Sequence, residues 1–82
     1  MLEFKFDVQL LIEGENLDED KISEEIQKTP GDCLLCVGDD ELIKVHYHTN
    51  FPWDTLKTCA AHGEICDIVV ENMERQTEGL NG

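Results

Sequence analysis

The chain has 82 residues, and its 19 acidic and 6 basic side chains give a formal net charge of −13. This length corresponds to one domain, and a hydrophobic content of 40% suffices for one core and argues against intrinsic disorder. The negative charge repels phosphate backbones and anionic lipids, which argues against nucleic-acid and membrane-surface binding. The first residues lack the pattern of a signal peptide and no apolar run reaches membrane-spanning length, so we expect a cytoplasmic protein.

The first predicted element is a strand over residues 3–13, in which apolar and polar residues alternate. Its apolar face consists of Phe4, Phe6, Val8, Leu10 and Ile12. Asp7 and Gln9 face the other side, because successive side chains of a strand point to opposite faces. The strand therefore has one face for a core and one face for solvent.

A helix is predicted next, from an N-cap at Asp18 to about Lys28. Ile22 and Ile26 are four residues apart and share the inner side of this helix. The helix ends before Pro30, because the residue that precedes a proline disfavours helical backbone.

A hairpin and a second helix follow. Residues 33–37 predict a short buried strand and residues 42–49 predict its partner, with a turn at 38–41 between them. Pro52 suits the first turn of the second helix, which ends at Gly63. The expected inner side of this helix consists of Leu56, Cys59 and Ala60.

The last predicted strand covers residues 65–70, so we expect one domain over residues 1–72 and a polar C-terminal tail or linker over residues 73–82. With right-handed crossovers, the order βαββαβ is that of a ferredoxin-like α+β two-layer sandwich. Its four-stranded antiparallel sheet has the first and third strands at the centre and both helices on one face. The other face of the sheet is then open.

His46 and His48 are two residues apart in the predicted strand 42–49 and project from the same face, with Cα atoms roughly 6.5–7 Å apart. Val45 and Tyr47 point the other way, into the core. Because the first and third strands are neighbours, we expect Asp7 beside the two histidines. A carboxylate and two imidazoles are a competent ligand set for zinc or another divalent ion.

Two residues are candidates for a fourth metal ligand: His62, at the end of the second helix, and Cys66, whose expected direction is inward. The alternative is that the histidines are ordinary polar residues of a solvated sheet face. In that case Asp7 pairs only with Lys44.

The four cysteines, Cys33, Cys36, Cys59 and Cys66, are not expected to form disulfides in a cytoplasmic protein. Cys33 and Cys36 have the C-x-x-C spacing, but they lie in an apolar run that predicts a strand. A redox pair is found at a helix N-terminus and a zinc knuckle needs a second pair. We therefore predict that both are small buried hydrophobic residues.

The open face of the sheet is predicted to carry apolar residues among its charges: Leu11, Leu42, Ile65 and Val69. Scattered apolar residues are normal on protein surfaces. In so short a chain, however, an apolar sheet face favours a docking surface for another domain or for a second copy.

Four segments in chain order resemble one protein family: Gly31–Asp39, Lys44–Pro52, His62–Glu64 and Glu71–Gln76. The most specific sequences among them are K-V-H-Y-H-T-N and E-N-M-E-R-Q. Together the segments resemble the middle domain of the bacterial dihydroxyacetone-kinase-like proteins associated with fatty acid kinase. The resemblance covers nearly the whole chain.

The resemblance implies a domain that lies between a nucleotide-binding kinase domain and a domain that engages the fatty-acid carrier. The sequence contains no P-loop and none of the metal–nucleotide loops of the kinase domain, so we expect no catalysis by this domain alone. The resemblance also implies that His46 and His48 bind a metal ion with a cysteine of the first strand. Asp7 stands at the matching place here, and a carboxylate is a harder ligand for zinc.

The leading hypothesis is a non-catalytic assembly or dimerisation module that binds zinc or another divalent ion on Asp7, His46 and His48. Its expected partners are a second copy of itself, a kinase domain or a fatty-acid-carrier domain. One alternative is a small-molecule regulatory domain, which rests on fold analogy alone. A second is a metal-dependent hydrolase or phosphatase with a metal-bound water, for which the sequence offers no evident general base.

Overall fold

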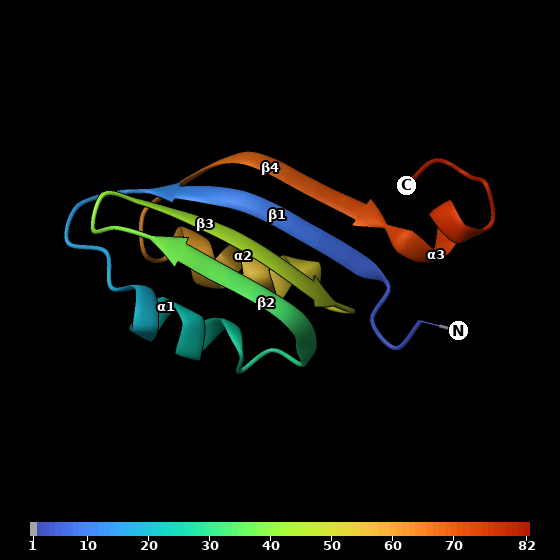
Figure 1. Ribbon diagram of the computed structural model, residues 1–82, viewed down its shortest axis with the longest axis horizontal. Helices are drawn as coiled ribbons and strands as arrows, with labels where there is room; N and C mark the ends of the chain where they lie inside the picture. Colours follow the sequence, from blue (N-terminus) through green and yellow to red (C-terminus); the bar gives the residue numbers. More distant parts are fainter. Residues whose placement is uncertain (1) are drawn as a thin grey trace.

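The computed structural model describes residues 2–82 and contains seven helices and strands. In chain order they are β1 (Phe6–Glu13), α1 (Glu19–Ile26), β2 (Gly31–Gly38), β3 (Leu42–Thr49), α2 (Pro52–Ala60), β4 (Glu64–Asn72) and α3 (Met73–Thr77). The strands form one antiparallel sheet in the order β2-β3-β1-β4 (Figure 1). This arrangement confirms the predicted ferredoxin-like α+β sandwich, with β1 and β3 at the centre.

One hydrophobic core lies between the sheet and the two longer helices. α1 packs against β2, α2 packs against β1 and β4, and the two helices contact each other. Among residues 2–82, nine hydrophobic residues are buried: Val8, Leu10, Ile12, Ile22, Ile26, Ile43, Val45, Tyr47 and Cys59. Six of them come from the inner faces of the two central strands, so the predicted alternation on those strands is confirmed. Burial of each large side chain contributes about 1.5–3 kcal/mol.

The first strand begins later than the sequence predicted. β1 starts at Phe6, and Phe4 lies before it and is not part of the sheet. Phe6 itself is only half-buried, because its ring contacts the largely exposed Trp53 at the end of the sheet rather than the core. The inner face of β1 is therefore shorter than predicted and consists of Val8, Leu10 and Ile12.

Both helices begin where the sequence predicted and bury most of the predicted residues. Asp18 caps α1, since its Oδ1 accepts a hydrogen bond from the backbone N–H of Lys21 at 3.1 Å. In α2 the prediction for Ala60 is wrong. Ala60 is exposed and Thr55 is buried instead, because each residue turns the helix by about 100° and the inner side runs through Thr55 and Cys59.

An irregularity in β2 changes the predicted position of one cysteine. Between Asp32 and Leu35 the register against β3 shifts, and Cys33 takes a left-handed backbone conformation with φ of 55°. This β-bulge leaves Cys33 exposed, so the prediction that it is buried is wrong. Cys36 is half-buried against α1, where its Sγ lies 3.8 Å from the carbonyl oxygen of Glu19.

Of the two β4 residues predicted on the open face, Ile65 and Val69, only Val69 lies there. Ile65 pairs with Ile12 and packs against the core, so its predicted place on the open face is wrong. A second irregularity follows at Asp67, whose φ is 49°, and it brings Val69 opposite Gln9 on the open face. Because of this bulge, simple alternation does not predict the whole strand.

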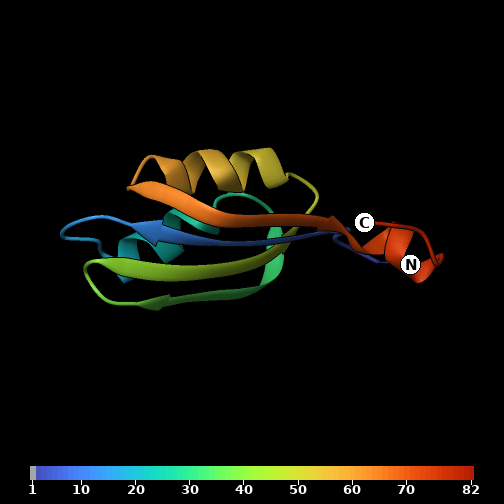
Figure 2. The same ribbon diagram turned by 90° about the horizontal axis from the view of Figure 1, so that it is seen from above.

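The C-terminal segment contains a short helix, α3, where the sequence predicted a polar tail or linker. Asn72 caps this helix, and the backbone N–H of Met73 donates to the carbonyl oxygen of Lys5 at 2.7 Å. The molecule is elongated, with extents of 41 × 22 × 17 Å, and Figure 2 shows α3 beyond the end of the sheet. Within residues 2–82 the structure has no helix with the length and apolar character needed to cross a membrane.

Candidate metal site

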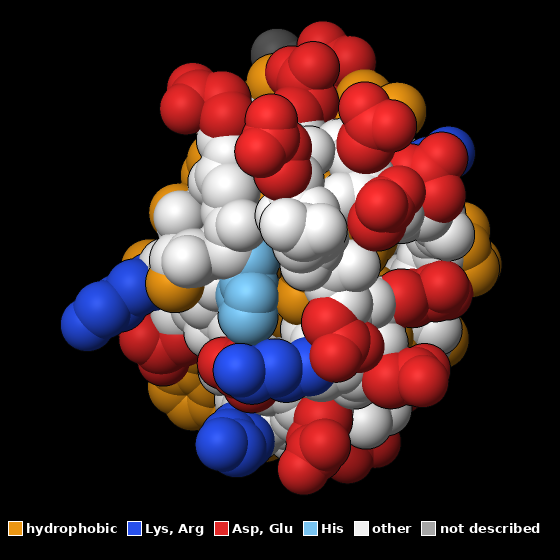
Figure 3. All heavy atoms as spheres, turned by 90° about the vertical axis from the view of Figure 1, so that its left-hand side faces the viewer, with side chains coloured by type: hydrophobic (Ala, Val, Ile, Leu, Met, Phe, Trp, Pro, Cys, Tyr) orange, Lys and Arg blue, Asp and Glu red, His pale blue; other side chains and the backbone are white. Residues whose placement is uncertain are grey.

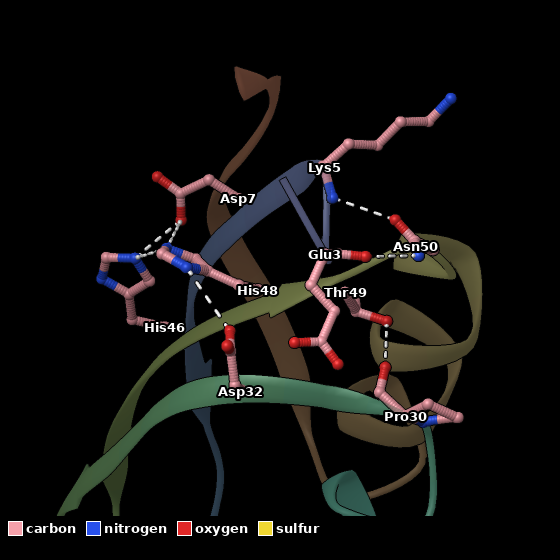
Figure 4. A network of polar contacts seen from close by, with 9 residues as sticks. All are labelled: Glu3, Lys5, Asp7, Pro30, Asp32, His46, His48, Thr49 and Asn50. Atoms are coloured by element: carbon pink, nitrogen blue, oxygen red, sulfur yellow. Dashed lines mark hydrogen bonds and ion pairs between the residues drawn. The ribbon is translucent and has the colours of Figure 1, made fainter. Parts of the chain in front are cut away.

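The central strands bring Asp7, His46 and His48 together on the open face of the sheet. In the antiparallel register of β1 and β3, Asp7 stands opposite His48 and Gln9 stands opposite His46. All three side chains point away from the helices, because their neighbours along each strand fill the core. Figure 4 shows the carboxylate and the two rings turned toward one another. The predicted grouping of these three residues is therefore present in the structure.

One oxygen and two nitrogens meet at the centre of this group. Asp7 Oδ1 lies 2.7 Å from His46 Nε2 and 3.7 Å from His48 Nε2, and the two nitrogens are 3.3 Å apart. Tetrahedral ligands at about 2.0–2.1 Å from a zinc ion are about 3.3–3.4 Å from each other. The distance between the two nitrogens matches this spacing, whereas the 2.7 Å between Asp7 Oδ1 and His46 Nε2 is that of an ion pair, so these two atoms would move apart around an ion.

The carboxylate of Asp7 is more buried than the two rings. Its side chain is 15% exposed, against 32% for His46 and 25% for His48. Oδ2 accepts a hydrogen bond from the side-chain amide of Gln9 at 3.2 Å. Oδ1 is buried and, among residues 2–82, receives no hydrogen bond of good geometry, although His46 Nε2 is close. One carboxylate oxygen and two imidazole nitrogens are donor types that a divalent ion accepts, so the residues present fit such an ion.

Residues next to the histidines fix the register of β3. Tyr47 points into the core between them, and its hydroxyl donates to the carbonyl oxygen of Thr29 at 2.6 Å. The hydroxyl of Thr49 donates to the carbonyl oxygen of Pro30 at 2.7 Å. Asn50 bonds the segment before β1, accepting from the backbone N–H of Lys5 at 2.9 Å and donating to the carbonyl oxygen of Glu3 at 3.0 Å (Figure 4). The residues Y-H-T-N therefore hold β3 against both neighbouring segments.

The edge strand β2 adds a second carboxylate that the sequence reasoning missed. Asp32 pairs with His48, and its Oδ1 lies 3.8 Å from His48 Nδ1, the ring nitrogen that faces away from Asp7. The signal available in the sequence was the predicted hairpin of the second and third strands. The bulge between Asp32 and Leu35 hid the pairing, because a regular strand counted back from the hairpin turn places Cys33, and not Asp32, opposite His48.

The two candidates for a fourth ligand do not join the group. His62 lies on the helical side, where its Nε2 is 3.0 Å from Oε2 of Glu25 on α1. Cys66 pairs with Leu11, which is four residues along β1 from Asp7, or roughly 13 Å. Its thiol donates to Glu13 Oε1 at 3.4 Å, so it faces the open side rather than inward as predicted.

The two thiols of β2, Cys33 and Cys36, have raised pKa values. The negative charge of Asp32 raises the pKa of the Cys33 thiol, and burial adds to the effect. Burial raises the pKa of Cys36 to about 11, with a further contribution from the charges of Glu19 and Asp20. Neither residue has the lowered pKa of a nucleophilic or redox-active cysteine.

A comparison with protein families identifies the chain. Residues 3–80 match the family model of the FakA-like middle domain of fatty acid kinase. The chain belongs to this family. The match covers all of the strands and helices, so the fatty acid kinase-like resemblance of the sequence is confirmed at the level of the domain family.

Relatives of this middle domain occur in staphylococci. An uncharacterized protein of Staphylococcus epidermidis is 46% identical over 46 residues, which is 56% of this chain and 8% of the relative. An uncharacterized protein of Staphylococcus saprophyticus is 39% identical over 59 residues, covering 72% of this chain and 10% of the relative. One of Staphylococcus aureus is 41% identical over 46 residues, covering 56% of this chain and 8% of the relative. The chain thus corresponds to about a tenth or less of these proteins.

Proposed function

We propose that this middle domain is a non-catalytic assembly module that pairs with a second copy through its open sheet face and binds a divalent metal ion at Asp7, His46 and His48. In a fatty acid kinase-like protein, catalysis then belongs to other domains. For the whole protein that contains this domain, the proposed activity is phosphorylation of fatty acids.

The observation that carries the assembly role is the apolar character of the open face around the metal group. Leu35 and Val37 of β2, Leu42 of β3 and Val69 of β4 are 41–45% exposed. Leu11 lies among them at the centre of the sheet, opposite Lys44. Exposed apolar residues gathered on a sheet face are typical of an interaction site, and a second sheet can pack on such a face about 10 Å away.

The distribution of charge favours this face over the ends of the molecule. Figure 3 shows the end that contains the loop before α1 and the β2–β3 turn, where acidic side chains are more prominent than basic ones. Two such ends would repel each other, because the chain has a net charge of −13. The open face carries exposed apolar residues on its edge strands β2 and β4, and it includes Lys44, which in a two-fold pair can approach a carboxylate of the partner.

A metal ion at Asp7, His46 and His48 would strengthen this pairing. The ion adds two positive charges to the open face of an acidic chain and reduces the repulsion between two copies. It also joins β1 to β3 at the centre of the sheet. When bound, it would supply structural cross-linking through one carboxylate oxygen and two imidazole nitrogens, and binding would stabilise the folded state by linkage.

The regulatory alternative has weaker support. The hollow on the open face, lined by Gln9, Leu11, Lys44, Val69 and neighbours, has a volume of about 260 Å³. Pockets for small molecules usually have about 300–1,000 Å³ and enclose most of the ligand. This hollow is smaller and lies on an open sheet, which suits a protein side chain better than an effector.

Sedimentation equilibrium of the chain over a range of concentrations, with zinc and with a chelator, tests the proposal. We expect a monomer–dimer equilibrium that shifts toward dimer with zinc and toward monomer in Leu35→Asp. Leu80→Asp is the matched control, because Leu80 has a similar exposure of 47% but lies in the C-terminal segment. A monomer at all concentrations, or equal weakening by both variants, would contradict pairing through the open face. A monomer that instead binds a kinase or carrier domain would also contradict it.

A further inference from the structure

The bulge in β2 places two neighbouring side chains on the same side of the sheet. From the pair Asp32–His48 to the pair Leu35–His46, β2 advances by three residues while β3 advances by two. The additional residue is accommodated at Cys33, where φ is 55°. In a regular strand Cys33 would point away from Asp32, toward the helices. A bulge re-aims such a side chain, and here it leaves the thiol exposed beside Asp32.

Cys33, Asp32 and His48 bring three donor atoms together. A sulfur, a carboxylate oxygen and an imidazole nitrogen of these residues all lie within 4.8 Å of one another. Asp32 Oδ1 is 3.8 Å from Nδ1 of His48, whereas the other ring nitrogen, Nε2, faces Asp7. The carboxylates of Asp7 and Asp32 therefore approach different nitrogens of one imidazole ring (Figure 4).

The chemistry of this second group differs from that of the first. It contains a thiol, which binds borderline and soft ions such as zinc and cobalt better than a carboxylate does. A carboxylate and a thiolate repel each other when no cation is present, and a divalent ion between them removes the repulsion. The group is exposed enough for an ion to enter from solvent, since the side chain of Asp32 is 54% exposed.

We propose that Asp32, Cys33 and Nδ1 of His48 form a second divalent-metal position, separate from the group of Asp7 and His46 but sharing the ring of His48. On binding, the Cys33 thiol releases its proton to solvent and Sγ bonds to the ion. The position is specific for thiophilic divalent ions and does not require an ion beside Asp7.

Titration of the reduced, tag-free chain with Co²⁺ tests this inference, because a cobalt–thiolate bond gives a near-ultraviolet charge-transfer absorption that nitrogen and oxygen ligands do not give. We expect this absorption in the unmodified chain and its loss in Cys33→Ser. Cys66→Ser is the matched control and keeps the absorption, since its thiol lies on the same sheet face but bonds Glu13. Asp7→Asn also keeps it, because the proposed position uses the other ring nitrogen.

The outcomes separate this inference from the proposed function. Cobalt binding without thiolate absorption, abolished by Asp7→Asn, would overturn the second position and leave the first intact. Absorption that survives Cys33→Ser would assign the thiol elsewhere and also overturn it. Loss of the absorption in Asp7→Asn would show that the thiol binds only as part of the first group. Absorption that persists in Asp7→Asn and His46→Gln but disappears in Cys33→Ser supports the second position even if the first binds nothing.

Discussion

The hydroxyl of Tyr47 donates a hydrogen bond of 2.6 Å to the carbonyl oxygen of Thr29. This buried bond ties the residue between the two histidines to the segment that leads into β2. It fixes the position of β3 relative to β2. Because both histidines belong to β3, it also fixes where their rings lie on the open face of the sheet. The core contact on one face thus determines the geometry of the polar group on the other.

Replacement of Tyr47 by phenylalanine should destabilise the fold. The variant keeps the ring in the core but leaves the buried carbonyl of Thr29 without its donor, which costs about 1–3 kcal/mol. Urea denaturation followed by circular dichroism measures the loss. Trp53→Phe, at a ring that is 60% exposed, is the control and should change the free energy of unfolding by less than about 0.5 kcal/mol. Equal stability of Tyr47→Phe and the unmodified chain would contradict the anchoring role.

Gly31 is required where β2 passes close to β3. A Cβ at this position would lie 2.4 Å from the carbonyl oxygen of His48 and 2.5 Å from the ring of Tyr47, closer than real atoms approach. Gly31→Ala should therefore destabilise the chain by at least about 2 kcal/mol, measured by the same denaturation. Gly14→Ala is the control, because its nearest contact is the flexible end of Leu17 at 3.0 Å. Similar stabilities of the two variants would argue against this packing.

Stability should fall at alkaline pH because of the buried thiol of Cys59. Burial raises the pKa of this thiol from 9.0 to about 12 in the folded chain. Between these values the unfolded chain has lost a proton that the folded chain retains, so the free energy of unfolding decreases as pH rises above about 9. One such group contributes a slope of up to about 1.4 kcal/mol per pH unit.

The variant Cys59→Ala isolates this contribution. Its free energy of unfolding should be lower at neutral pH because of the lost packing, but it should decline less steeply between pH 9 and the onset of alkaline unfolding. Urea denaturation at a series of pH values measures both slopes. Parallel pH profiles for the two proteins would show that the thiol titrates alike in the folded and unfolded states.

The metal preference of the site should depend on the residue at position 7. A thiolate is a softer ligand than a carboxylate, so Asp7→Cys should bind zinc more tightly, by about tenfold or more. The same variant should bind magnesium and calcium no better, since those ions prefer oxygen. Competition with a zinc indicator measures the change. Weaker zinc binding by Asp7→Cys would indicate that position 7 does not contact the ion.

Strand alternation was sufficient to predict the central part of this molecule. The apolar residues of β1 and β3 have an unbroken period of two, and the ferredoxin-like order makes these strands neighbours. Those two facts place Asp7 beside His46 and His48. The register of β1 against β3 is then set by the core, because a slip of one residue would turn the polar side chains of a strand toward the helices.

The edge strands could not be predicted in the same way. Bulges at Cys33 and Asp67 change the alternation at single residues, and both have positive φ. Cysteine gives no sequence signal for this backbone conformation, and aspartate gives only a general enrichment that does not specify a bulge within a strand. The prediction therefore misplaced Cys33 and Ile65 and missed Asp32. His62 was misplaced for another reason: its partner, Glu25, belongs to a helix far away in the sequence.

The zinc affinity of the tag-free chain is the decisive quantity for the metal site, measured by isothermal titration calorimetry for the unmodified protein, His46→Gln and His62→Gln. We expect the zinc ion at Asp7, His46 and His48, counted separately from any ion at the proposed second position of Asp32 and Cys33, to bind about 100-fold or more weakly, roughly 2.7 kcal/mol, in His46→Gln. His62→Gln should bind as tightly as the unmodified chain, because His62 contacts Glu25 on the helical side. Absence of zinc binding, or equal affinities of all three proteins, would contradict a metal site on the open face.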